Sequence, residues 1–449
     1  MKALKRLSYL FLLMFTIFAM ESAASAEWKE KVLYSFQGLP DGYQPAGGVV
    51  FDKHGNLYGA TTNGGSSSCV GPFQCGTVYQ VKPPAKEGDP WTETVLYVFK
   101  GSDSNDGASP FGGLIMDASG NLYGTTGYDG TGDCRLGGGN AGCGTVYELS
   151  PPTEKGGPWT ETVLYNFKGG TDGQLPVGDL VFDKQGNLYG ATQYGGGYGS
   201  CNPSFYQHCG TVFKLSPPKT KGSKWTEKVL HGFKGGTDGA NPNGGLIFDS
   251  KGAIYGTTYS GGNQSCKYDS SVGCGTAFQL NPPANKGAAW KEAVLRRFVA
   301  DQGNPSAGLT FNGNGNLFGT TLGMIFRLAP PPPKSDGWKE TTLYTFNQNA
   351  YGPEGALIFN LSGDLYGTTN VGSGESLQGS VFRLKAASKK ADPWIFTVIH
   401  GFLGPPDGDF PAAGLVFDKN GNLYSTTQAG GTGTGCGHGG CGTVFEVSP

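Results

Sequence analysis

Short runs of alternating apolar and polar residues recur along the whole chain, separated by segments rich in Gly, Pro, Asp and Asn. One unit contains the runs WTETVLYNF (159–167), DLVFD (179–183), NLYGATQ (187–193) and GTVFKL (210–215). Runs of about four to eight residues rich in Val, Leu, Phe, Tyr and Thr and bounded by turn formers are typical of β-strands. No segment has a helical pattern long enough to predict a helix. The pattern therefore predicts an all-β chain built from units of four strands.

The four-strand unit repeats seven times, and each repeat opens at a tryptophan. The units start near Trp28, Trp91, Trp159, Trp225, Trp290, Trp338 and Trp394. Seven repeats of this kind predict a seven-bladed β-propeller with one four-stranded antiparallel sheet per blade. We expect the inner strand to be LVFD, followed by NLYGTT, GTVF and the outer WTETVLY.

The phase of the repeat predicts how the ring closes. The chain ends with a GTVFEV strand (442–447), so the last blade lacks an outer strand, and the first Trp-type strand (28–36) supplies it. A ring closed in this way has no exposed sheet edge. An open β-solenoid is the alternative, but it gives no reason for the chain to start and stop in this phase.

The N-terminal residues have the pattern of a secretory signal peptide. A basic start is followed by an apolar run (7–20) and an A-x-A site at 24–26. We expect residues 1–26 to be removed and residues 27–449 to form a single propeller domain. No cysteine follows the cleavage site and no hydrophobic tail ends the chain, so we expect no membrane anchor and a secreted or periplasmic location.

The composition narrows the function classes. Aromatic residues make up 12% of the chain and hydrophobic residues 37%, which is enough for a packed core despite 79 Gly and 28 Pro. The formal net charge is −2, without the basic surplus of a nucleic-acid binder. The expected partner is an extracellular glycan or a surface protein, and the expected oligomeric state is a monomer.

Most of the recurring polar residues have a structural explanation. The Asp that precedes each Gly-Asn turn accepts backbone N–H groups in such turns. The members are Asp52, Asp117, Asp183, Asp249 and Asp418. A Ca²⁺ loop needs six to eight oxygens and this motif offers one carboxylate, so we expect no cofactor. The tryptophans are expected to pack between blades, with a sugar platform as the alternative.

Ten cysteines form five pairs, each within the loop between NLYGTT and GTVF. The pairs are Cys69/Cys75, Cys134/Cys143, Cys201/Cys209, Cys266/Cys274 and Cys436/Cys441. In an exported chain, cysteines that appear and vanish together predict disulfides within the loop. Zinc is the alternative, but each loop offers two sulfurs and no reliable third ligand.

Strand order places the Cys loops and a recurrent D-G-x-x-P loop on one face, around the channel mouth. The carboxylates of this second loop are Asp41, Asp106, Asp172, Asp238 and Asp407. One interpretation is that these residues shape turns. The other is that they form a ring of ligand-contacting sites, because loops on a rigid scaffold often carry function.

The repeat is broken in a few places. The fifth and sixth units lack cysteines, which predicts a low wall and a lateral notch at the channel mouth. Asp179 stands where most units have Gly, Glu354 lies beside the glycine (Gly355) that precedes the inner strand of the sixth unit, and Tyr351 falls in the short-loop sector. We take these three as ligand-binding candidates. A catalytic carboxylate pair is not expected from opposite blades, which are too far apart.

Recognised catalytic motifs are missing from the sequence, which contains no G-x-S-x-G, H-E-x-x-H or P-loop pattern. His231 and His400 fill the position of Tyr97 and Tyr165 in other units and are interpreted as packed aromatic residues. No catalytic residue and no metal ligand are predicted.

One motif resembles a known repeat. G-G-L-x-x-D-x-x-G-N-L-Y-G-T-T stands at 112–126, followed by a Gly-rich segment and a GTV strand at 144–149. A similar form stands at 245–258 with 275–280. These residues resemble the GloVer (Gloeobacter–Verrucomicrobia type) tandem repeat over nearly all of the chain after residue 26. The resemblance implies a propeller-like fold and export, and implies no established activity.

Three functions remain open at this stage. The first is a non-catalytic binding module for glycans or cell-surface polymers. The second is a passive envelope scaffold for protein interaction. The third is a polysaccharide hydrolase or lyase.

Overall fold

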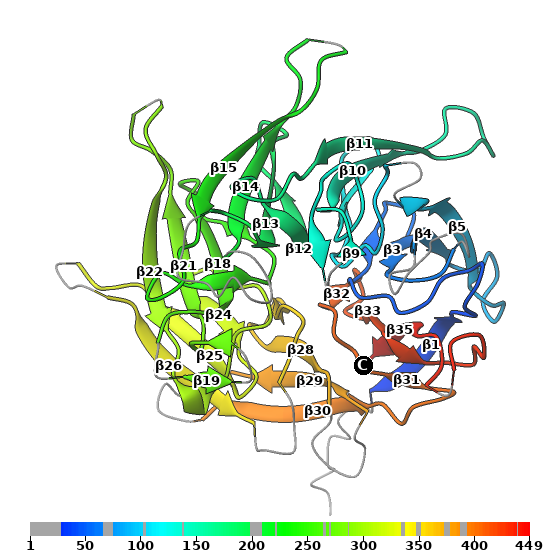
Figure 1. Ribbon diagram of the computed structural model, residues 1–449. Helices are drawn as coiled ribbons and strands as arrows, with labels where there is room; N and C mark the ends of the chain where they lie inside the picture. The colour runs from blue at the N-terminus through cyan, green and yellow to red at the C-terminus, as the bar shows by residue number, and fades with distance from the viewer. Residues whose placement is uncertain are drawn as a thin grey trace, which may run out of the picture.

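The computed structural model describes residues 28–449, with short gaps. The gaps are 66–74, 102–104, 137–138, 198–208, 221, 264–265, 269–270, 286, 334–336, 347–351, 372–377, 387–392 and 438. The predicted signal peptide therefore lies outside the described residues. The described chain forms seven four-stranded antiparallel blades arranged in a ring (Figure 1). The predicted seven-bladed β-propeller is confirmed.

Each blade contributes one strand of each type. The inner strands are β2 (Val50–Phe51), β6 (Ile115–Met116), β12 (Gln174–Phe182), β17 (Ile247–Phe248), β23 (Thr310–Phe311), β27 (Ile358–Phe359) and β32 (Val416–Phe417). The second strands are β3 (Leu57–Thr61), β7 (Leu122–Thr126), β13 (Leu188–Tyr194), β18 (Ile254–Ser260), β24 (Leu317–Thr320), β28 (Leu365–Thr369) and β33 (Leu423–Thr427). The third strands are β4 (Thr77–Lys82), β10 (Thr145–Ser150), β14 (Thr211–Ser216), β21 (Thr276–Asn281), β25 (Met324–Ala329), β29 (Ser380–Lys385) and β35 (Thr443–Ser448). The outer strands are β5 (Thr92–Val98), β11 (Thr160–Asn166), β15 (Thr226–Gly232), β22 (Lys291–Arg297), β26 (Lys339–Thr345), β30 (Ile395–Gly401) and β1 (Lys29–Ser35).

Short strands and one 3₁₀ turn lie in the loops. β16 (Ala240–Pro242) pairs with β18. Three two-stranded pairs are β8 (Arg135–Leu136) with β9 (Gly139–Asn140), β19 (Lys267–Tyr268) with β20 (Ser271–Val272), and β31 (Gly408–Asp409) with β34 (Ala429–Gly430). The 3₁₀ turn is η2 (Ala300–Gln302).

The first strand of the chain completes the last blade. β1 pairs antiparallel with β35, with Lys29 opposite Ser448 and Ser35 opposite Thr443. Figure 1 shows the blue N-terminal strand beside the red C-terminal strands. A side-chain bond also crosses the closure, because the Thr426 hydroxyl in blade seven donates to the Gly47 carbonyl in blade one at 3.0 Å.

Aromatic side chains pack between neighbouring blades. The Phe at the end of one outer strand meets an aromatic ring on the third strand of the next blade, as in Phe99–Tyr147 and Phe167–Phe213, with centroids 5.0 Å apart. Edge-to-face pairs of this kind contribute about 0.5–1.5 kcal/mol each beyond area burial. Four tryptophans pack against an aromatic ring of the preceding blade, as expected for this position: Trp28 on Tyr366, Trp159 on Tyr58, Trp338 on Tyr255 and Trp394 on Phe318.

The paired glycines before the inner strands allow the blades to approach closely around the axis. A Cβ on Gly112 would lie 2.4 Å from the Gly178 carbonyl oxygen, and one on Gly244 would lie 2.3 Å from the Gly308 nitrogen. Real Cβ atoms do not tolerate such contacts, so the channel wall is built largely from backbone.

The Asp-x-x-Gly-Asn turns have the geometry expected from the sequence. In the first, Asp52 Oδ1 accepts N–H groups from His54 and Asn56, and Oδ2 accepts the Asn56 amide and the Tyr58 hydroxyl. Burial raises the pKa of Asp52, but these hydrogen bonds more than offset it and hold that pKa below its usual value. All four of these hydrogen bonds to the Asp52 carboxylate come from the turn and the strand that follows it.

Three of the predicted disulfides lie within the described residues: Cys134–Cys143, Cys266–Cys274 and Cys436–Cys441. Cys75 and Cys209 are also disulfide-bonded, and their predicted partners, Cys69 and Cys201, lie outside the described residues.

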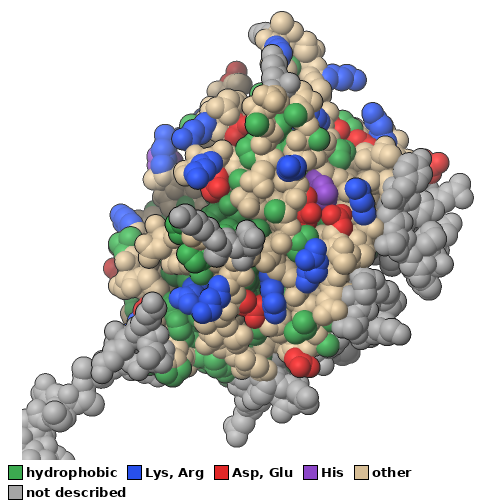
Figure 2. All heavy atoms as spheres, turned by 90° about the vertical axis from the view of Figure 1, so that its left-hand side faces the viewer, with side chains coloured by type: hydrophobic (Ala, Val, Ile, Leu, Met, Phe, Trp, Pro, Cys, Tyr) green, Lys and Arg blue, Asp and Glu red, His purple; other side chains and the backbone are tan. Residues whose placement is uncertain are grey.

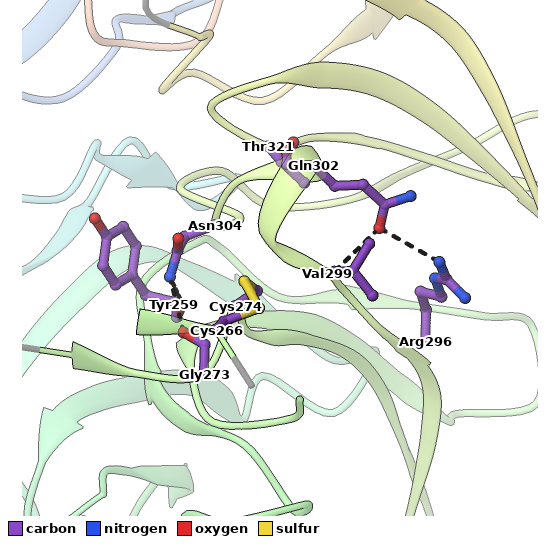
Figure 3. The surroundings of a disulfide bond; sticks show 9 residues. All are labelled: Tyr259, Cys266, Gly273, Cys274, Arg296, Val299, Gln302, Asn304 and Thr321. Atoms are coloured by element: carbon purple, nitrogen blue, oxygen red, sulfur yellow. Dashed lines mark hydrogen bonds between the residues drawn. A yellow bond between two sulfur atoms is a disulfide. The ribbon is translucent and has the colours of Figure 1, made fainter. Parts of the chain in front are cut away.

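The disulfide loop of blade four is tied to the next blade. The buried Asn304, from the loop that leads to blade five, donates its amide to the carbonyls of Tyr259 and Gly273 at 2.7 and 3.3 Å (Figure 3). The disulfide and this bridging amide together hold the loop against the ring.

Candidate functional site

A central cavity of about 450 Å³ lies on the ring axis. Its wall comes from the residues that directly precede the inner strands and those that end or follow the second strands. The lining includes Phe111, Asn243, Tyr128, Tyr259, Gln193 and Gln428 together with the paired glycines. Because inner strands start, and second strands end, at the face that carries the Cys loops, the cavity belongs to that face.

Asp179 is the unrepeated feature of this cavity. The equivalent residue is Gly in five blades and Ala356 in blade six. Its carboxylate accepts the Gly113 N–H from the neighbouring blade at 2.6 Å. The side chain of Asp179 is exposed to solvent in the channel. The surrounding ring of protein desolvates the carboxylate and raises the pKa of Asp179, and the hydrogen bond from Gly113 lowers it in part.

Glu354 lines the same cavity from blade six, so the structure brings two of the three unrepeated candidates to one place. Tyr351 lies outside the described residues. In the fifth blade the second and third strands are joined by a tight turn, where the Thr321 N–H donates to the Met324 carbonyl at 2.9 Å. The corresponding loop of the sixth blade (372–377) lies outside the described residues, so the lateral notch stays a prediction.

The five Asp-Gly carboxylates lie at the blade junctions, where each caps the turn after an outer strand. Asp106 accepts the Tyr97 hydroxyl at 2.6 Å and the Lys100 N–H at 3.1 Å. Asp172 accepts the Tyr165 hydroxyl and the Lys168 N–H, both at 2.7 Å. The same contacts recur at the other members, Asp41, Asp238 and Asp407, with a histidine in the tyrosine position of the last two.

These bonds supply the turn-shaping role for the five carboxylates. Their second interpretation, as ligand-contacting sites, stays a prediction. A carboxylate already bound by a backbone N–H and a tyrosine has less acceptor capacity left for a ligand.

A glutamate from the next blade completes each of these junctions, and sequence reasoning missed it. It stands two residues after the Trp, and the members are Glu30, Glu93, Glu161, Glu227 and Glu292. Burial, followed by repulsion from Asp41, raises the pKa of Glu93 to about 8. Burial and Asp106 likewise raise the pKa of Glu161 to about 7. The signal that could have identified this glutamate is an acidic residue that recurs on the inward face of the alternating outer strand.

Two junctions carry histidine in the tyrosine position. His231 lies beside Asp238 and Glu292, and His400 lies beside Asp407 and Glu30. Each imidazole also packs edge-on against a phenylalanine, His231 on Phe233 and His400 on Phe402. The packing of both histidines against aromatic rings is as expected from the sequence, and the acidic neighbours are an additional finding.

The remaining two junctions use different chemistry. In one, Arg296 forms an ion pair with Glu340 at 2.5 Å, and Gln302 replaces the aspartate and donates to the same glutamate. In the other, Phe396 replaces the glutamate and stacks on Tyr344 with ring centroids 4.1 Å apart.

Within the described residues, no helix is long and apolar enough to cross a membrane. The three described disulfides indicate an oxidising compartment outside the cytoplasm.

Several solved structures align with this chain at low identity. A fungal alcohol oxidase in complex with copper aligns with a TM-score of 0.53 and 13% identity over 94% of this chain and 77% of the oxidase. PorZ, a surface component of the type-IX secretion system of Porphyromonas gingivalis, aligns with a TM-score of 0.48 and 14% identity over 92% of this chain and 47% of PorZ. A putative oxidoreductase (glucose dehydrogenase) from Thermus thermophilus gives 0.42 and 14% over 94% and 100% of the two chains. At such identities the likeness concerns the fold alone.

No curated protein matches the sequence. The Gloeobacter/Verrucomicrobia repeat matches it three times, at residues 16–200, 135–330 and 266–449. These overlapping matches span the whole propeller and confirm the resemblance carried by the repeated motif. The chain belongs to the Gloeobacter/Verrucomicrobia repeat family.

Proposed function

We propose that this chain is an exported, non-catalytic binding propeller that takes a glycan, or another ligand rich in hydroxyl groups, at the mouth of its central channel. The observation that carries the proposal is the cavity of about 450 Å³, whose wall includes the unrepeated Asp179. Ligand pockets in proteins have volumes of about 300–1,000 Å³.

The chemistry of the wall supports a ligand of this class. The amides of Gln193, Asn243 and Gln428 line the cavity, and an amide both donates and accepts hydrogen bonds, as a hydroxyl group does. The half-buried ring of Tyr259 offers flat apolar surface for the C–H face of a sugar ring. Small residues and backbone form the rest of the wall, which leaves the polar groups accessible.

Export is part of the proposal. The signal-peptide pattern at residues 1–26 and the disulfides both fit a protein that works outside the cytoplasm. Surface polymers rich in sugars are the partners available there.

One observation favours a second candidate, a polysaccharide hydrolase or lyase. Asp179 and Glu354 line the same cavity, and desolvation by the surrounding protein raises the pKa of Asp179, as in carboxylic acids that donate protons. The same experiment separates the two functions.

The test is a glycan and polysaccharide binding screen on the oxidised mature chain, followed by product analysis on every hit. Asp179→Gly is the decisive variant because five blades carry Gly at this position and fold with it. Asp133→Asn is the matched control, since Asp133 is an exposed carboxylate in the Cys loop of blade two and does not line the cavity.

We expect saturable binding without product, lost in D179G and kept in D133N. Cleaved product would replace the binding function by the hydrolase or lyase. No binding across the panel would leave the passive scaffold as the function.

A further inference from the structure

Two blade junctions combine a histidine with two carboxylates from separate elements. In the first, His231 comes from β15, Asp238 from the following loop and Glu292 from β22 of the next blade. In the second, His400 comes from β30, Asp407 from the following loop and Glu30 from β1. Within each junction, one nitrogen or oxygen atom from every residue lies within 4.8 Å of the other two.

The histidine junctions are wider than their tyrosine counterparts. Tyrosine hydroxyls lie 2.6–3.0 Å from the aspartate oxygens, which are ordinary hydrogen bonds. In both histidine junctions Nε2 lies 3.5 Å from the aspartate Oδ2. Two ligands bound tetrahedrally at Zn–N and Zn–O distances of about 2.0–2.2 Å lie roughly 3.3–3.5 Å apart. The histidine spacing fits two ligands of one ion better than a direct hydrogen bond.

The atoms that face one another in these junctions have no hydrogen-bond partner. They are His231 Nε2 and Glu292 Oε1 in one junction, and His400 Nε2 and Glu30 Oε1 in the other. The glutamate oxygen is also unpartnered in the tyrosine junctions, at Glu93, Glu161 and Glu227, so the histidine nitrogen is the atom that distinguishes these two sites. Buried polar atoms normally have a partner, and each histidine nitrogen has only the aspartate oxygen at 3.5 Å, which is longer than an ordinary hydrogen bond.

Both junctions lie at the rim of the ring, close to solvent, which leaves a path for an ion. The side chains of His231 and Asp238 keep 14% and 21% of their surface exposed, and those of His400 and Asp407 keep 19% and 17%. Figure 2, which faces the rim over β22 and β26, shows histidine beside acidic side chains at the surface. An ion could therefore enter from solvent without unfolding the blade.

We propose that the chain binds two divalent transition-metal ions of the Zn²⁺ class, one at His231–Asp238–Glu292 and one at Glu30–His400–Asp407. One imidazole and two carboxylates are a ligand set that Zn²⁺ accepts, with water in the fourth position. Ca²⁺ is disfavoured because it takes oxygen ligands only, six to eight in number.

Each ion would join two blades. The first connects blades three and four, and the second connects blade six to β1, the strand that closes the ring. Ions that bind only the folded chain stabilise it by mass action. The proposed role is therefore a metal clamp on the ring, strongest at its closure.

The test is Zn²⁺ titration of the metal-stripped, oxidised mature chain at pH 7.5, followed by calorimetry and by competition with a chromophoric chelator. We expect two tight equivalents for the unchanged chain and one for His231→Tyr or His400→Tyr. The double variant should bind none. These variants should fold because four other junctions carry Tyr in that position. Zn²⁺ should raise the Tm of the unchanged chain and leave that of the double variant unchanged.

A gain-of-function variant and a surface control sharpen the test. Tyr165→His places an imidazole beside Asp172 and Glu227, and should raise the stoichiometry to three. His54→Tyr removes an exposed histidine from a turn and should leave it at two. A large excess of Ca²⁺ should not displace Zn²⁺ at either site.

The proposal fails if the unchanged chain and the double variant bind the same amount of Zn²⁺, or if neither binds any. Equal binding would place the Zn²⁺ at other residues, and no binding would leave the imidazole and the two carboxylates without a metal ion.

Discussion

The rim and the channel of this propeller use carboxylates in opposite ways. At the blade junctions of the rim, Asp106 caps a turn, accepts the Tyr97 hydroxyl and faces Glu161 of the next blade. The same arrangement recurs around the ring. In the channel, Asp179 has no counterpart in another blade, and its one described partner is the Gly113 N–H. The repeated carboxylates hold blades together, whereas the unrepeated one faces the space a ligand would occupy.

Repetition therefore marks structure in this chain, and departures from it mark candidate function. The histidine junctions lie between these extremes, because they keep the repeated aspartate and glutamate but replace one aromatic residue. Five expected outcomes test the contrast, four on stability and a last one on binding.

The largest stability effect is expected from Asp106→Ala. Asp106 is 3% exposed, and its removal leaves the Tyr97 hydroxyl and the Lys100 N–H without their acceptor. We expect the free energy of unfolding to fall by about 2–4 kcal/mol, measured by denaturant titration. Asp133→Ala, on the exposed Cys loop, should change it by less than about 0.5 kcal/mol. Equal effects would mean that the junction carboxylates do not hold the blades.

Loss of one disulfide should have the next largest effect. The Cys266→Ala/Cys274→Ala double variant removes a bridge that spans 8 residues of sequence. For a loop of this size the chain-entropy estimate is about 2–3 kcal/mol. Denaturant titration of the oxidised proteins measures the difference. Unchanged stability would show that Asn304 and its hydrogen bonds hold this loop without the disulfide.

A smaller loss is expected from Tyr97→Phe, which removes one hydrogen bond and keeps the ring. The expected cost is about 1 kcal/mol. Tyr344→Phe is the matched control, because Tyr344 stacks on Phe396 in the junction without the glutamate. That variant should be close to neutral. A reversed order of the two variants would contradict the role assigned to the repeated hydroxyl.

The smallest effect concerns pH. Burial and Asp41 raise the pKa of Glu93 to about 8 in the folded chain, from 4.5 in a free residue. The folded state therefore favours the protonated form. Its contribution to stability is fully present below about pH 4.5 and is lost as pH rises through about 8.

Glu161 and Glu227, with pKa values raised to about 7, act in the same direction. We expect Tm to fall between pH 5 and pH 9, and Glu93→Gln to recover about 1–2 °C at pH 9 while changing little at pH 5. Parallel Tm curves for both proteins would remove Glu93 from the explanation.

The propeller could be predicted because each blade repeats its own local signals. The Asp52 turn, the alternating strand after Trp159 and the terminal 442–447 strand are all readable within one unit. Ring closure by β1 followed from the phase of the repeat alone. The pairing of cysteines within one loop, seen in Cys134–Cys143, required no knowledge of the rest of the chain.

The blade junctions could not be predicted in the same way. The burial of Glu161 depends on the next blade covering it, and its neighbour Asp106 lies 55 positions earlier in the chain. Sequence spacing places the two residues in different units and does not give the angle between their blades. Asp179 was identified as an oddity, but its place in a shared cavity with Glu354 depends on how the seven inner strands meet.

The most direct test of the rim–channel contrast measures two quantities on the same preparations: the affinity for the strongest glycan found in the screen, and the free energy of unfolding. We expect D179G to bind at least about ten-fold more weakly with unchanged stability, and Y97F to lose about 1 kcal/mol of stability with unchanged affinity. If D179G binds as the unchanged chain does, or if no glycan binds, the assignment of function to the unrepeated carboxylate of the channel is wrong.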